Sequence, residues 1–161
     1  MSAGPLVAVT RMSNGLEYSV HELPAKIRRE VAYVFPDVDL QGMLVIPTCQ
    51  KSDQDLVQMG EAVENEKDRL LERFVDWAKP VCEKLISWGY WADYIDPCSG
   101  LPMISPGQSV YSEVDALTAL LGYKTQNAGC CKILLHPQWG SSVYPASLFT
   151  KAPAEKLLEA I

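Results

Sequence analysis

A long stretch of helical periodicity at residues 57–88 constrains the fold of this chain more than any other feature. Apolar side chains recur there every three or four residues, which places them on one face of an α-helix. They are Val63, Leu70, Phe74, Trp77, Val81, Leu85 and Trp88. The intervening charges of both signs indicate a solvated opposite face. The pattern predicts a long core helix, which Pro80 bends or divides in two.

Apolar runs of strand length indicate a sheet for this helix to pack on. Residues 5–10 and 16–20 flank Asn14-Gly15, which is typical of a hairpin because Asn-Gly favours positive φ values. Residues 43–46 predict a strand that is buried on both faces, ended by Pro47 and followed by a loop at 48–52.

The second half of the chain adds further strands at residues 90–96, 129–136 and 143–149. We expect the last two to form a hairpin, with Pro145 indicating an edge or a bulge. Residues 123–128 are polar and predict a loop.

Local sequence signals also predict three shorter helices and the environments of one histidine and two cysteines. The helices are predicted at residues 23–35, at 112–121 with Ser112 as N-cap and Gly122 as terminator, and at 152–158. We expect His21 to be solvated at a strand end and Cys49 to be structural. Residues 96–100 predict an Asp-capped turn that carries Cys98.

Two adjacent cysteines, Cys130 and Cys131, open an apolar run that continues to Leu135. Side chains alternate between the faces of a strand, so Cys131 shares the apolar face of Ile133 and Leu135. That face is predicted to be the core, which leaves Cys130 exposed on the other one. An equally weighted alternative is a buried strand with two inert cysteines.

The neighbours of Cys130 favour a reactive thiol in the first of these interpretations. Lys132 shares its face, and a nearby ammonium favours the thiolate. Gly129 has no Cβ, so a ligand or another backbone can approach the sulfur closely.

Charge and cysteine usage narrow the class of partner. A net charge of −6 argues against nucleic acid or an anionic membrane, because both demand a basic patch. Five cysteines without C-x-x-C spacing indicate reduced thiols in an intracellular compartment rather than a zinc site. No apolar run reaches the length of a membrane span, and the first residues lack the features of a targeting signal.

Common catalytic motifs are absent from the sequence. There is no G-x-G-x-x-G, P-loop, G-x-S-x-G or H-E-x-x-H. His136 lies six residues beyond Cys130, roughly 20 Å away in an extended strand, which disfavours a cysteine–histidine pair. No Arg/Lys cluster suited to a flavin phosphate is visible, so we expect no tight binding of flavin.

Several segments taken together resemble the cblD family, the methylmalonic aciduria and homocystinuria type D proteins of cobalamin trafficking. They are residues 89–97, Ser99-Gly100-Leu101, Leu121-Gly122-Tyr123, Gly129-Cys130-Cys131-Lys132 and Trp139-Gly140. The likeness is strongest over residues 23–150. An N-terminal hairpin at 1–22 and a C-terminal helix at 151–161 complete what we interpret as a single domain over 1–161.

The resemblance implies an α+β, nitroreductase-like sandwich, mostly antiparallel sheet packed with helices, whose flavin site is lost. It implies a non-enzymatic adaptor that binds a cblC-type cobalamin-processing protein and directs cobalamin toward methylcobalamin or adenosylcobalamin synthesis, with methionine synthase as a further partner. A cysteine thiolate would bind cobalt while the partner holds the corrin. By position that cysteine is Cys130, supported by Gly129, Lys132 and Asn127.

Two other functions are compatible with the residues. One is a flavin-dependent, nitroreductase-like oxidoreductase, and the other is a thiol redox sensor that forms sulfenic acid at Cys130. Cys98, where we expect serine in relatives, adds a second exposed thiol. The predicted location is cytoplasmic, and full-length family members also occur in mitochondria, but the family's long N-terminal targeting region is not present here.

Overall fold

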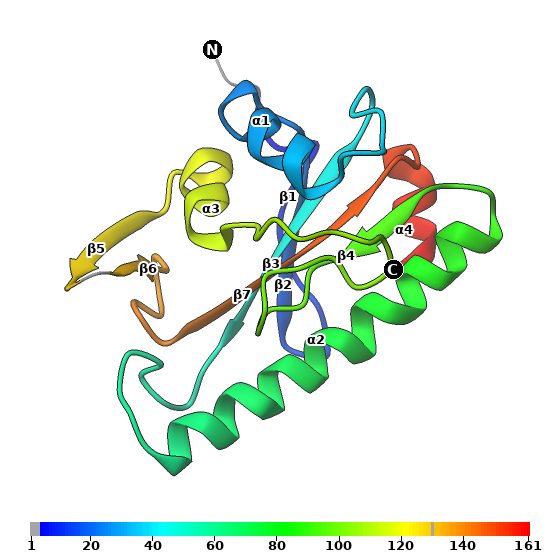
Figure 1. The fold of residues 1–161 in the computed structure, drawn as a ribbon. Coiled ribbons are helices and arrows are strands. Elements are labelled where there is room, and N and C mark those ends of the chain that lie inside the picture. Colours follow the sequence, from blue (N-terminus) through cyan, green and yellow to red (C-terminus); the bar gives the residue numbers. More distant parts are fainter. Residues whose placement is uncertain (1–3, 130) are drawn as a thin grey trace.

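The computed structural model describes residues 4–129 and 131–161, and this part of the chain forms an α+β fold (Figure 1). Five antiparallel strands form one sheet in the order β1-β2-β3-β7-β4, and β5 and β6 form a separate hairpin. The strands are β1 (Val7–Arg11), β2 (Leu16–Glu22), β3 (Leu44–Lys51), β4 (Ala92–Tyr94), β5 (Lys124–Ala128), β6 (Cys131–Leu135) and β7 (Val143–Thr150). The helices are α1 (Ala25–Val34), α2 (Glu61–Ser87), α3 (Glu113–Leu121) and α4 (Ala154–Ala160).

Helices cover both faces of the five-stranded sheet. Leu44 and Ile46 of β3 belong to a core cluster with α2 and α4, whereas Val45 belongs to a second cluster with α1 and α3. Successive side chains of β3 therefore enter opposite cores, as expected of a strand with two buried faces. The prediction of a central buried strand is confirmed, and so is the predicted antiparallel sheet packed with helices.

The long helix α2 is confirmed as one continuous element of 27 residues. Its buried face includes Phe74, Val81 and Leu85, which share one core cluster with residues of the sheet. Pro80 lies within α2 on the exposed side and does not divide it. The missing hydrogen bond of a proline is tolerated here because burial of the apolar face stabilises the helix on both sides of it.

Strand β3 is longer than predicted. It continues through Pro47 to Lys51, where we expected a loop at residues 48–52. Pro47 pairs with Ser147 of β7, and pairing with β2 resumes at Thr48 and Tyr18. Because β3 has a neighbour on each side, the donor that proline lacks removes only one bond and does not end the strand.

The C-terminal strands pair differently from the prediction. Residues 124–128 form β5 rather than a loop, and β6 pairs with β5 rather than with β7. β7 lies instead between β3 and β4. β4 pairs only with Leu148–Thr150, so Pro145 lies where β7 has an open edge, in agreement with its expected position.

His21 is buried rather than solvated, with 3% of its surface exposed. Its Nε2 is hydrogen-bonded to Ser19 Oγ at 2.8 Å. β2 lies between β1 and β3, so the end of the strand is covered where the sequence indicated only a terminus. Burial disfavours the charged ring and lowers the pKa of His21 to about 4.

We expect this histidine to make the protein sensitive to mild acid. His21 takes up a proton near pH 6.5 in the unfolded chain but only near pH 4 in the folded chain. The free energy of unfolding therefore falls as the pH drops from 6.5 to 4. The loss reaches at most about 3 kcal/mol. Urea unfolding of wild type and His21→Gln across this range measures it.

The difference between the two proteins isolates His21 from other buried groups. Glu113, whose pKa burial raises to about 8, contributes an opposite slope, but it is present in both proteins. The wild type should lose stability relative to His21→Gln toward pH 4. Identical pH profiles for the two proteins would show that His21 does not titrate as its burial predicts.

Candidate functional site

The candidate site is the hairpin of β5 and β6, which lies beside α3 at one edge of the molecule (Figure 1). The register ends with Ala128 opposite Cys131, and Gly129 has a φ of +65°. That conformation favours glycine at a tight turn. Cys130 lies outside the described residues, so its predicted exposure and its role as cobalt ligand stay predictions.

The predicted core face of β6 is wrong. Cys131 is exposed, Ile133 and Leu135 are half-buried, and Leu134 is the buried residue, with 4% of its surface exposed. Leu134 packs in a small cluster with Leu117 and Val143. Alternation correctly predicts two faces, but β6 belongs to a separate two-stranded hairpin, so the core contacts it only near its base. The Cys131 thiol therefore lies at the surface.

The three supporting residues predicted for the site lie in this hairpin. Asn127 pairs with Lys132 across the two strands, and Gly129 follows in the turn. Lys132 Nζ lies 3.5 Å from Asp115 Oδ1 on α3, with both side chains mainly exposed. The lysine thus has a carboxylate partner, a contact that the sequence pattern did not indicate. A Cβ added to Gly129 would meet no atom within 4 Å, so the turn conformation is what requires glycine there.

His136 anchors the base of the hairpin. Its ring is 5% exposed, and its Nε2 lies 2.9 Å from Glu17 Oε1 on β2. Its Nδ1 accepts the backbone N–H groups of Gln138 at 3.1 Å and Trp139 at 3.3 Å. An Nδ1 that accepts two bonds carries no proton, so we assign the proton to Nε2, which donates it to Glu17. Both nitrogens are engaged in holding structure.

Aromatic packing and α3 fix the same region. The rings of His136 and Trp139 stack with centroids 3.9 Å apart, and Tyr123 meets His136 edge-on at 5.4 Å. Thr118 Oγ1 of α3 donates to the carbonyl of Tyr123 at 3.2 Å. The predicted ends of α3 are confirmed, because Ser112 Oγ accepts Asp115 N–H and Gly122 ends the helix with positive φ. The exposed hairpin therefore rises from a rigid base.

The remaining described cysteines fall into two groups. Cys49 and Cys82 are buried, and burial raises the pKa of both thiols, in agreement with a structural Cys49. Cys98 is exposed in the predicted turn, where Asp96 Oδ1 accepts its backbone N–H at 3.0 Å. Cys98 and Cys131 are thus the exposed thiols within residues 4–129 and 131–161.

The described part of the chain contains no group of three or more His, Cys, Asp or Glu side chains placed to hold a metal ion. None of its helices is both long enough and apolar enough to span a bilayer.

The chain is similar in sequence to proteins of one known family. The chain matches the family described as methylmalonic aciduria and homocystinuria type D protein over residues 8–160. It is 36% identical to cobalamin trafficking protein CblD of Rattus norvegicus over 141 residues, which are 87% of this chain and 48% of the relative. Identity to the Homo sapiens protein is 36% over 138 residues, 85% of this chain and 47% of the relative. The chain spans about half the length of the curated relatives it matches.

Proposed function

The chain belongs to the methylmalonic aciduria and homocystinuria type D protein family, and on that premise we propose that it is a non-enzymatic adaptor in intracellular cobalamin trafficking. It binds a cblC-type processing protein that carries the corrin and directs the cargo toward methylcobalamin or adenosylcobalamin synthesis, with methionine synthase as a further partner. The observation that carries the proposal is the 36% identity to cobalamin trafficking protein CblD over 87% of the chain.

Within this adaptor, the Cys130 thiolate is the ligand that reaches cobalt. A thiolate is a soft donor suited to a polarizable transition metal. The two residues adjacent to Cys130 in the sequence, Gly129 and Cys131, are both exposed at the end of the hairpin. A metal centre held by another protein can approach such an end without displacing the core. Asn127 and Lys132 form the pair next to Ala128 and Cys131, so they supply an amide and a cation near the end of the hairpin.

We propose that the sheet with helices on both faces is a nitroreductase-like sandwich whose flavin site has been lost. Cobalamin is bound only together with the processing protein. An exposed cysteine such as Cys98 suits the reducing cytoplasm, which we propose as the location, and full-length relatives would also serve mitochondria.

Complex formation tests this function directly. The protein is mixed with cobalamin-loaded processing protein and analysed by sizing chromatography and visible spectroscopy. We expect co-elution and a new cobalt–thiolate absorption, because the partner supplies the corrin and this chain supplies the sulfur.

Free cobalamin without the processing protein is the control and should leave the spectrum unchanged. Separate elution of the two proteins would contradict the adaptor proposal. Micromolar binding of flavin by this chain alone would instead support the oxidoreductase alternative.

A further inference from the structure

Four basic side chains from three elements surround a cavity of about 370 Å³ on the α2 side of the molecule. They are Arg11 of β1, Lys51 at the end of β3, and Arg69 and Arg73 of α2. Asp53 is the one acidic residue among those that line the cavity. The whole chain has 14 Lys and Arg residues and a net charge of −6, so this concentration of cations is local. A cavity with this lining attracts an anion.

Two of the guanidinium groups already have carboxylate partners. Arg69 Nη2 lies 3.5 Å from Oδ2 of Asp53, which lines the cavity. Arg69 Nε and Nη2 donate to the buried carboxylate of Glu66 at 2.6 and 2.9 Å. Arg11 Nη2 lies 3.4 Å from Glu17 Oε2, and its guanidinium carbon lies 5.4 Å from the centre of the Trp139 ring. Groups fixed in this way lose little conformational freedom when a ligand binds.

Arg73 differs because no carboxylate of the described residues forms an ion pair with it. It is half-buried and lies one turn after Arg69, a spacing at which like charges repel. Its Nη1 would lie 3.1 Å from a Cβ built on Gly15, whose φ is +93°. The glycine thus leaves room for a guanidinium that forms no ion pair within the described part of the chain.

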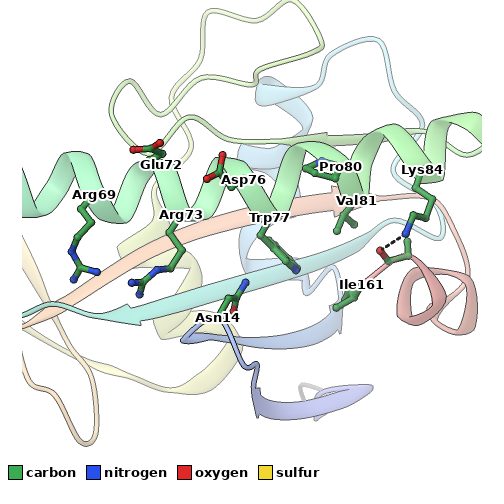
Figure 2. Close-up of a pocket in the computed structure, with 11 residues that line it drawn as sticks. Asn14, Arg69, Glu72, Arg73, Asp76, Trp77, Pro80, Val81, Lys84 and Ile161 are labelled. Atoms are coloured by element: carbon green, nitrogen blue, oxygen red, sulfur yellow. Dashed lines mark hydrogen bonds between the residues drawn. The ribbon is translucent and has the colours of Figure 1, made fainter.

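A neighbouring groove of mixed charge adjoins this cavity. It has a volume of about 630 Å³ and shares Arg69 and Arg73 with the first cavity. Figure 2 shows Arg69, Arg73 and Trp77 on the side of α2 that faces Asn14, while Glu72 and Asp76 project from the other side. The buried Nε1 of Trp77 has no acceptor within the part of the chain that the structure describes. Arg69, Arg73 and the Trp77 indole therefore present donors on the Asn14 side of α2, while the carboxylates of Glu72 and Asp76 also line this groove.

We propose that the cavity between Arg11, Lys51, Arg69 and Arg73 binds the phosphoryl group of a small molecule. Guanidinium forks pair with phosphate oxygens in a bidentate manner, and a lysine adds a mobile point charge. Donors that reach the cavity from three elements suit a tetrahedral oxyanion better than a planar carboxylate with two oxygens. The inference is independent of the cobalt ligand, because neither cavity includes a residue of the β5–β6 hairpin.

Calorimetric titration at constant ionic strength tests the proposal. The probes are inorganic phosphate, pyrophosphate, AMP and, as a partner without phosphate, adenosine. Wild type should show saturable binding of at least one phosphate-bearing probe and none of adenosine. Arg73→Gln and Lys51→Gln should each weaken that binding at least about tenfold, because each removes a charged donor. Tightest binding of pyrophosphate identifies an inorganic source, whereas tightest binding of AMP identifies an organic phosphate.

Lys79→Gln is the matched control, since Lys79 is exposed on the same helix and lines neither cavity. It changes the net charge equally and should leave binding within about twofold of wild type. Circular dichroism verifies folding, and Arg73→Lys, which restores the charge, should recover part of the affinity. The proposal is wrong if wild type binds no phosphate-bearing probe saturably, or if Lys79→Gln weakens binding as much as Arg73→Gln.

Discussion

Replacing Cys130 with serine is expected to abolish the cobalt–thiolate absorption of the mixture of this protein, the processing protein and cobalamin, while the heterocomplex persists. A serine hydroxyl keeps the approximate shape of the thiol but is a hard, protonated donor at neutral pH, so the metal bond is lost. Protein–protein affinity arises from a surface many residues wide and should survive. Visible spectra and sizing chromatography of the same samples separate the two effects.

Cys131→Ser and Cys98→Ser are the matched controls because both thiols are exposed. Each should retain the absorption and the complex. Exposure of Cys131 also implies an unfolding free energy within about 0.5 kcal/mol of wild type, whereas its predicted burial implied a loss of about 1 kcal/mol. If the band survives in Cys130→Ser and vanishes in Cys131→Ser, then Cys131 is the ligand and the assignment made from the motif is wrong.

Replacing His136 with alanine should lower the free energy of unfolding by about 3–5 kcal/mol and release the hairpin from its base. The change deletes the buried bond to Glu17 and the acceptor for Gln138 and Trp139 N–H. It also removes the ring stacked on Trp139. Oε1 of the buried Glu17 loses its donor and bears the cost of its desolvation, while Oε2 keeps its contact with Arg11. Urea unfolding measures the loss, and amide hydrogen exchange of β5 and β6 reports the release.

Gln138→Ala is the control, since this exposed side chain lies in the same loop and its backbone bond to His136 remains. It should change stability by less than about 0.5 kcal/mol and leave exchange in the hairpin unaltered. A loss below about 1 kcal/mol in His136→Ala, or unchanged exchange in β5 and β6, would show that His136 does not anchor the hairpin.

Elements with strong local signals were predictable. Helix α2 follows from the repeat of apolar residues around Phe74, and α3 follows from the cap at Ser112 and the terminator at Gly122. The hairpin of β1 and β2 follows from Asn14-Gly15. In each case the signal lies within a few residues of its consequence, so it is visible without knowledge of the tertiary structure.

Features that depend on tertiary contacts could not be predicted from the sequence. All five residues of β5 are exposed, so the strand has no apolar alternation to predict it. Alternation alone predicts a buried face for β6 as in a strand of the main sheet, and this places Cys131 wrongly because β6 pairs only with β5. The burial of His21 and His136 depends on strands distant in sequence. Pairing between Lys132 and Asp115 likewise arises only when α3 packs beside the hairpin.

The basic cavity shows the same limit for a binding site. Arg11, Lys51 and Arg73 are far apart in the sequence, yet they line one cavity because β1, the end of β3 and α2 meet there. A site built from separate segments has no motif, and only the arrangement of the chain reveals it. The thiol site, in contrast, can be predicted from the sequence, because its residues are adjacent there and form a pattern that resembles the family.

Cobalt K-edge X-ray absorption of the complex tests the central claim most directly, because it reports the element bound to the metal. The complex with wild-type protein should show a sulfur atom in the first coordination shell of cobalt, and the complex with Cys130→Ser should show only lighter atoms there. A first shell without sulfur in wild type, or with sulfur retained in Cys130→Ser, would contradict the account.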